Sequence, residues 1–163
     1  MRTCSYPALL MLIVLAVAGA GCGPGEERGA ESLPADLEAA ITAFYAAIEA
    51  GDAEARLALF SDDAAMMPNH WTMYRGRQAI AEVARAEGWI FRLRDRKLVD
   101  SGATGDLAYT VNSYFYTYHA EGSEPQWHKT KNVHIWKRDG AGLWKLHLDI
   151  WNSDVPMSQF AAE

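Results

Sequence analysis

The sequence predicts an α+β domain in which three helices precede an antiparallel sheet. Apolar residues recur at helical spacing from Leu37 to Ile48, and after Gly88 the apolar period changes to two. Short runs of turn residues, SGATGD, EGSEP and DGAG, separate the segments of period two. Helices followed by hairpin-connected strands are typical of the α+β class. A length of 163 residues with 50% hydrophobic composition suits one domain with one core.

The helical part of the pattern divides into three helices and one short strand. The first helix is expected to begin after Pro34 and to end at Gly51, a typical C-terminal stop. Asp52 can cap a second, shorter helix, because its carboxylate can accept from a free backbone N–H group. A short strand is expected over residues 64–67, and a third helix over residues 77–87.

Four strands are expected in the second half of the chain. Each combines alternating apolar and polar residues with bounding turn residues. The basic run FRLRDRK alternates in the same way, so we interpret it as the solvated face of a strand and not as a ligand site. The expected strands cover residues 89–99, 107–119, 127–138 and 143–151.

The first 21 residues predict export. Arg2 precedes an unbroken apolar run over residues 8–20, which is too short to span a bilayer but suits a secretory signal. The small residues before Cys22 resemble a bacterial lipobox, so we expect residues 1–21 to be removed and Cys22 to be lipidated, anchoring the protein to the cell envelope. A plain cleaved signal that leaves Cys22 as an odd thiol is the alternative. Cys4 lies in the discarded segment, so the domain would have no disulfide.

Residues 22–33 are expected to form a flexible tether between anchor and domain, because Gly, Pro and Glu dominate there without apolar periodicity. Removing residues 1–21 takes away Arg2 and no acid, which changes the formal net charge from −6 to −7. Such an acidic domain argues against nucleic acid as a partner.

The order of these elements, with the segments FYAAIEAGDAEARLALFSDDAAMM, YRGRQAI, GDLAY and GLWKLHLDIWNSD, resembles the nuclear transport factor 2-like superfamily. Within it, the chain is most similar to the SnoaL-like and domain-of-unknown-function 4440 groups. The resemblance implies a cone in which three N-terminal helices pack on a curved antiparallel sheet and enclose a pocket. It places the domain at residues 34–156 and leaves residues 157–163 as a tail.

Ketosteroid isomerases share this fold, but the resemblance does not carry their chemistry across. Their helix-one tyrosine, catalytic aspartate and acidic hydrogen-bond donor match Phe44, Pro68 and His134 here. A phenyl ring cannot donate a hydrogen bond, and proline has no side-chain base.

The last hairpin decides which side chains face the pocket. If DGAG places Arg138 opposite Leu143, antiparallel pairing puts His134 beside His147 and Asn132 beside Asp149. Hydrophobicity alone would turn the apolar face inward, whereas the resemblance turns the polar face inward, and we expect the latter. An apolar outer face would need cover, which a homodimer supplies. The expected pocket face carries Asn132, His134, Trp136, His147, Asp149 and Trp151; the expected outer face carries Val133, Ile135, Trp144, Leu146, Leu148 and Ile150.

Asp149, His134 and His147 form the candidate catalytic group. A carboxylate beside a histidine can orient it or raise its pKa, and histidine titrates near neutral pH. The same residues can instead form a satisfied hydrogen-bond network in a binding cavity. The candidate ligand-binding residues are Asn132, Trp136, Trp151, Asn152, Phe115 and Thr130, which offer amide groups and apolar walls.

We therefore expect a small hydrophobic or oxygenated ligand, with an acid/base enzyme of the isomerase, cyclase, dehydratase or epoxide hydrolase type as the first alternative. A dimeric interaction module is the second. No cofactor is expected, because GxSxG, phosphate-loop and dinucleotide motifs do not occur. A metal site at His128, His134, His147 and Asp149 has suitable ligand types but no compact motif, so none is expected. His70, Trp71 and Tyr74 lie in a loop that either covers the cavity mouth or packs ordinarily.

Overall fold

A computed structural model of the protein describes residues 32–154. The expected signal peptide, the lipidated Cys22, most of the tether and the tail over residues 157–163 lie outside the described residues, so they remain predictions. Within residues 32–154, no helix is long and apolar enough to cross a membrane.

Helices and strands follow the predicted order. The helices are α1 (Ala35–Ala50), α2 (Ala53–Ala58) and α3 (Arg77–Ala84). The strands are β1 (Phe60–Met67), β2 (Tyr74–Arg75), β3 (Trp89–Thr104), β4 (Leu107–Ala120), β5 (His128–Arg138) and β6 (Trp144–Ser153).

Local chemistry explains where the first two helices end and begin. Gly51 ends α1 in the left-handed conformation, with φ of 69°, and its N–H donates to the carbonyl of Ile48 at 3.1 Å. Asp52 caps α2 as predicted, because its carboxylate accepts from the backbone N–H of Ala55 at 2.9 Å. The third helix ends at Ala84, three residues earlier than predicted, and the two-residue strand β2 was not predicted.

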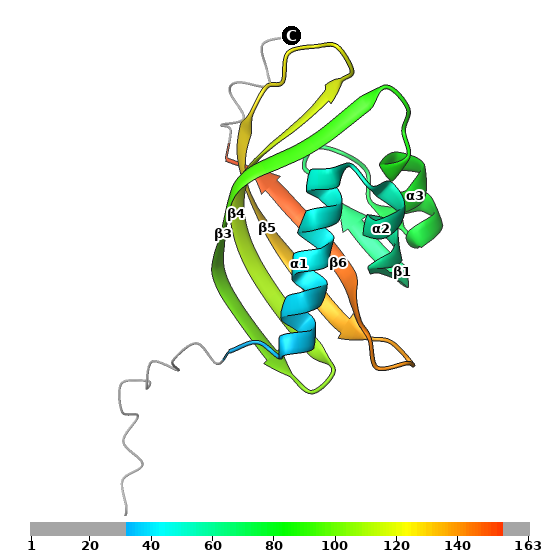
Figure 1. Ribbon diagram of the computed structural model, residues 1–163, viewed down its shortest axis with the longest axis vertical. Coiled ribbons are helices and arrows are strands. Elements are labelled where there is room, and N and C mark those ends of the chain that lie inside the picture. The colour runs from blue at the N-terminus through cyan, green and yellow to red at the C-terminus, as the bar shows by residue number, and fades with distance from the viewer. Residues whose placement is uncertain (1–31, 155–163) are drawn as a thin grey trace, which may run out of the picture.

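The strands form one six-stranded sheet in the order β2-β1-β6-β5-β4-β3. The prediction of a fully antiparallel sheet is wrong at one pair, because β1 runs parallel to β6. A parallel pair requires a long crossover, which the helices and β2–β5 supply. Figure 1 shows α1 lying across the concave side of the sheet while the long strands β3 and β4 curl around it. The predicted α+β cone with a curved sheet is otherwise confirmed.

A β-bulge in β6 corrects the predicted register of the last hairpin. Arg138 pairs with Trp144 instead of Leu143, and Trp136 pairs with Leu146. The next pair joins Ile135 to Leu148, so His147 is an extra residue without an opposite partner on β5. Beyond the bulge, His134 lies opposite Asp149 and not opposite His147.

The bulge changes which residues of β6 face inward on either side of His147. Trp144 and Leu146, expected outside, lie in the core and are 4% and 0% exposed. Beyond His147, the inward residues are Asp149 and Trp151. The two expectations for the hairpin, apolar face inward and polar face inward, thus each hold for one half of the strand.

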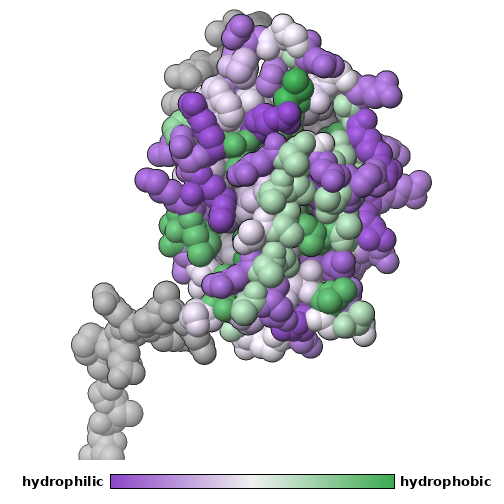
Figure 2. Space-filling view, viewed as in Figure 1, coloured by the Kyte–Doolittle hydropathy of each residue, from purple (hydrophilic) through white to green (hydrophobic). Residues whose placement is uncertain are grey.

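The core lies between α1 and the concave face of the sheet. Leu37, Phe44 and Ile48 of α1 pack against Trp136 and Leu146 of the central strands. The outward side of α1 is largely alanine, which Figure 2 shows as a pale green column amid a mostly polar surface.

Candidate functional site

A cavity of about 870 Å³ opens between α1, α2 and the concave face of the sheet. Its volume is that of a pocket for a small organic molecule. Residues from all three helices and from all six strands line it. The lining includes Phe44, Tyr45, Arg56, Pro68, Trp71, Tyr74, Trp89, Phe91, Arg92, Tyr114, Tyr116, Tyr118, His128, Asn132, His134, Asp149 and Trp151.

Three polar side chains from β5 and β6 meet at the floor of this cavity. His134 Nε2 lies 3.1 Å from Asp149 Oδ1 and 2.6 Å from Asn132 Nδ2. The His134 side chain is 2% exposed and the Asp149 side chain is 10% exposed. Asp149 uses only Oδ1 in this contact, so its second carboxylate oxygen is available to a molecule in the cavity.

The position of one proton decides how these three residues bond. His134 Nε2 carries either a hydrogen or a lone pair, so it cannot donate to Asp149 while it accepts from the Asn132 amide. Donation to Asp149 requires the Asn132 amide to present its oxygen instead of its nitrogen. The trio therefore couples the proton on His134 to the orientation of Asn132.

Aromatic rings surround His134 on the helix side. The ring of Phe44 meets the imidazole edge to face at 5.3 Å, and the ring of Tyr45 stacks on it at 6.0 Å. The Tyr45 hydroxyl is buried beside the Asn132 side chain, without a hydrogen bond of good geometry. Burial raises the pKa of Tyr45 and the charge of Asp149 adds to this, whereas the charge of Arg96 and the contact with Asn132 lower it. Burial likewise raises the pKa of Tyr114, with the Asp149 charge adding to the effect.

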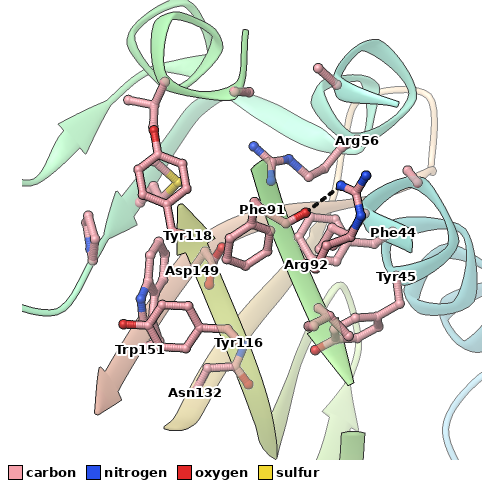
Figure 3. A pocket seen from close by; sticks show the side chains of 18 of the residues that line it. Phe44, Tyr45, Arg56, Phe91, Arg92, Tyr116, Tyr118, Asn132, Asp149 and Trp151 are labelled. Atoms are coloured by element: carbon pink, nitrogen blue, oxygen red, sulfur yellow. Dashed lines mark hydrogen bonds between the residues drawn. The ribbon is translucent and has the colours of Figure 1, made fainter. Parts of the chain in front are cut away.

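The mouth of the cavity combines exposed aromatic rings with two arginines (Figure 3). Trp89 stacks on Tyr118 at 4.8 Å, and the indole of Trp71 donates to the Tyr74 hydroxyl. Trp71 and Tyr74 thus lie at the mouth, whereas His70 of the same loop does not line the cavity.

Arg56 of α2 is half-buried at the mouth of the cavity. Its guanidinium lies over the ring of Phe91, with Cζ 5.8 Å from the ring centre. Burial lowers the pKa of Arg56, and the negative charge of Asp149 partly opposes that shift. Its Nε–H group is buried and has no acceptor among the described residues.

Four of the predicted site residues come together in the cavity: Asn132, His134, Asp149 and Trp151. His147 does not, although it was predicted to lie beside His134. The bulge turns His147 to the outer face, where its Nδ1 lies 3.2 Å from Ser61 Oγ and 3.3 Å from Asp63 Oδ1. The prediction that His147 faces the pocket is therefore wrong.

Ser61, Asp63 and His147 match a nucleophilic triad in residue type only. His147 meets both partners through the same nitrogen, and the Ser61 hydroxyl donates to Asp63 at 2.8 Å. A working triad needs the base to meet the nucleophile through one ring nitrogen and the carboxylate through the other. This cluster therefore links the paired strands β1 and β6 and does not activate a nucleophile.

The other four predicted ligand-binding residues lie outside the cavity. Trp136 is 0% exposed and packs in the core against Phe44. Thr130 is also 0% exposed, and its hydroxyl donates to the backbone carbonyl of Asn152. The Asn152 side chain is exposed, because it lies one residue beyond inward-facing Trp151. Phe115 lies on the outer side of β4 under Arg94, whose Cζ is 5.6 Å from its ring.

Sequence reasoning missed Tyr45, Arg56 and the tyrosines of β4. The alternation of Tyr114, Tyr116 and Tyr118 was a readable signal, because residues two apart on a strand share a face. Arg56 and Tyr45 gave no such signal, since their roles depend on how the helices are placed over the sheet. The four residues weighed as metal ligands do not converge: no group of three or more potential ligands occurs within residues 32–154.

Comparison with known protein families decides the assignment. The model of the SnoaL-like domain matches residues 37–148, more than half of the chain. This chain belongs to the SnoaL-like family. A comparison with curated proteins finds no match.

Solved structures show that this SnoaL-like domain has the fold of nuclear transport factor 2-like proteins. A ketosteroid isomerase-like protein from Erwinia carotovora atroseptica has a TM-score of 0.66 at 19% identity, over 75% of this chain and 96% of that one. A nuclear transport factor 2-like protein with a cystatin-like fold from Novosphingobium aromaticivorans has a TM-score of 0.57 at 17% identity, over 78% and 87%. A protein from Thiobacillus denitrificans, provisionally assigned as a calcium/calmodulin-dependent protein kinase type II association domain, has a TM-score of 0.58 at 26% identity, over 71% and 93%.

In this SnoaL-like domain, the three positions matched to ketosteroid isomerases all line the cavity: Phe44, Pro68 and His134. Only His134 can exchange a proton there. The group that faces the cavity with a free oxygen is Asp149, which is not one of the three. Any proton transfer in this cavity would thus use a different arrangement of side chains.

Proposed function

We propose that the cone pocket binds a small, partly hydrophobic molecule that presents a hydroxyl or carbonyl oxygen to the floor. The observation that carries this is the cavity of about 870 Å³, walled by aromatic rings, with one free Asp149 oxygen at its base. An apolar pocket with few convergent polar groups is the usual form of a ligand site. Within the SnoaL-like family, we assign the chain to the domain-of-unknown-function 4440 group on the motifs of its first helices.

The second candidate function is acid/base catalysis in the same pocket, favoured by the contact of Asp149 with His134. Asp149 would accept a proton from the substrate at its free oxygen, and His134 would hold the carboxylate in place through Oδ1. Such a pair suits an isomerase, cyclase, dehydratase or epoxide hydrolase. His147 has no part in this proposal, because it lies on the outer face.

Calorimetry with 2-naphthol, an apolar ring with one hydroxyl, tests ligand binding directly. We expect one molecule bound per chain, and we expect Trp151→Ala to weaken binding about tenfold or more, since a buried aromatic wall is worth at least 1.4 kcal/mol. Leu143→Ala is the matched control, because Leu143 is 58% exposed and lies outside the pocket.

Asp149→Asn separates the two functions. In both cases the variant should keep its affinity for the ligand within a few-fold. Only an enzyme has turnover to lose, measured on any molecule that mass spectrometry finds in the native protein. Absence of 2-naphthol binding, of a retained molecule and of any thermal shift would contradict the pocket proposal and favour an interaction module.

We also propose that the protein is lipid-anchored through Cys22 to the cell envelope and forms a homodimer through the outer face of its sheet. Supporting the dimer, residues of β4, β5 and β6 align there in apolar rows. One row joins Val111, Val133 and Ile150, and the next joins Tyr109, Ile135 and Leu148. Contiguous apolar area on a sheet face is usually covered. The similarity to a protein provisionally assigned as an association domain agrees with this proposal.

Two measurements on a Cys22→Ser variant test these proposals: membrane fractionation tests the anchor, and light scattering tests the dimer. Loss of the acylated thiol should move the protein from the membrane fraction to the aqueous fraction, where its mass should be that of two chains. Val133→Lys should give the mass of one chain, because a charge would be buried at the interface. Membrane retention of Cys22→Ser would contradict the anchor, and a single-chain mass without Val133→Lys would contradict the dimer.

A further inference from the structure

Arg56 is a half-buried cation whose Nε–H is fully buried and has no acceptor among the described residues. No carboxylate within residues 32–154 lies in salt-bridge range of Arg56. Its guanidinium lies over the face of Phe91. Buried guanidinium groups are normally paired, because desolvation of an unpaired charge is costly. The guanidinium therefore has N–H donors that an anion in the cavity would accept from.

Arg92, the other arginine at the mouth, is already engaged. Its Nη1 donates to the carbonyl of Phe91 at 2.9 Å, the contact drawn as a dashed line in Figure 3. Its guanidinium also lies against the end of α1, within 3.5 Å of where a side chain on Gly51 would begin. Arg92 thus adds positive charge to this side of the cavity and gives one of its five N–H donors to the backbone, whereas the described residues accept none from Arg56.

Asp149 places the opposite requirement on the other end of the cavity. Its free oxygen is an acceptor, and a negative group next to it would be repelled. A molecule that fits both ends must therefore present a hydrogen-bond donor to Asp149 and an anion to Arg56. The rings of Phe91, Tyr116 and Trp151 lie in the same cavity and suit a flat apolar body.

We propose that the pocket is built for an aromatic or alicyclic hydroxy acid, whose carboxylate binds Arg56 and whose hydroxyl donates to Asp149. This inference rests on the proposed binding function and names its ligand class. The planar fork of Arg56 matches a carboxylate in two parallel hydrogen bonds. The charge of Asp149 gives the molecule one orientation in the cavity.

Calorimetry at neutral pH with three probes tests the class: 6-hydroxy-2-naphthoate, its neutral amide 6-hydroxy-2-naphthamide, and 2-naphthol. We expect the acid to bind at least about tenfold more tightly than the amide, the ratio that a charged hydrogen bond supplies. Arg56→Gln should abolish this preference by weakening the acid and leaving the amide within about twofold. Arg85→Gln is the matched control, because Arg85 is an exposed α2-facing arginine already paired with Glu54.

Thermal melting of the ligand-free variant tests separately whether the charge of Arg56 lacks a partner in the protein. Arg56 has no salt bridge among the described residues and lies over the face of Phe91, so Arg56→Gln should melt close to the temperature of the parent protein, as Phe91→Leu should. A loss for Arg56→Gln well beyond that of Phe91→Leu would show that the charge of Arg56 is satisfied by the protein itself, which overturns the inference.

The binding outcomes distinguish this inference from the proposed function. Equal affinity for acid and amide, with 2-naphthol bound, overturns the hydroxy-acid class but leaves the pocket proposal intact. A preference for the acid that survives Arg56→Gln overturns the role of Arg56. Failure of all three probes to bind contradicts the pocket proposal and this inference with it.

Discussion

Leu146→Ala should lower the free energy of unfolding by about 2–5 kcal/mol, the range for a buried leucine. Leu148→Ala, two residues along the same strand, should lower it by less than about 1 kcal/mol. Leu146 is 0% exposed and packs in the core, whereas Leu148 is half-buried on the outer face. In a regular strand the two residues would share a face and cost the same. The difference between them measures the bulge at His147.

Urea denaturation followed by circular dichroism gives both values. Repeating it at several protein concentrations separates the outer-face contribution of a dimer, because only that part depends on concentration. Similar losses for the two variants at all concentrations would mean that β6 has no bulge, and Asp149 and Leu146 would then face opposite sides of the sheet.

Most of the fold could be predicted from the sequence because its elements leave local signals. Gly51 and Asp52 mark a helix end and a helix start by their own chemistry, and both act as predicted. The four long strands follow from alternation over many residues, which averages out local exceptions. Strand β2 is two residues long and leaves no such pattern.

The bulge could not be predicted, because a single extra residue in one strand reverses which side chains face inward beyond it. Alternation along LHLDIW supports one face for the whole strand, and neither choice of face is right throughout. The choice is made by packing: Trp144 and Leu146 fill the core under α1, while Asp149 and Trp151 meet the open cavity. This is tertiary information that a single strand does not contain.

The candidate site divides in the same way. Asp149, His134 and Asn132 were predicted because strand pairing brings them close together and the family resemblance turned their face toward the pocket. Arg56 and Tyr45 were not predicted, because both belong to amphipathic helices in which an arginine or a tyrosine is ordinary. Their significance lies in polar atoms that are buried without hydrogen bonds of good geometry, which only the packed structure shows.

Alkaline pH should unfold this domain steeply above pH 10, because Tyr45 and Tyr114 are buried in their neutral forms. Burial raises the pKa of each above the value of about 10 that tyrosine has in an unfolded chain. Below pH 10 both states hold these protons and the stability does not change. As the pH rises above 10, the unfolded chain releases them first, so stability falls until the folded-state pKa is passed.

Each such tyrosine costs about 1.4 kcal/mol per pH unit in this window, so the pair should remove about 3 kcal/mol per unit. Urea titrations between pH 9 and 12, with tyrosinate absorbance as the probe, measure the slope. Tyr45→Phe should roughly halve it, because phenylalanine has no proton to lose. The same substitution should change stability at pH 7 by no more than about 1 kcal/mol, since the hydroxyl loses only a poorly aligned contact with Asn132.

Tyr74→Phe is the matched control for this measurement. The Tyr74 hydroxyl accepts from the exposed indole of Trp71 at the cavity mouth, so its loss should leave the alkaline slope intact. A Tyr45→Phe protein with the full slope would show that the tyrosine is solvated through the cavity. The hydroxyl beside the Asn132, His134 and Asp149 trio would then be open to water, and the cavity floor would be wetter than its lining implies.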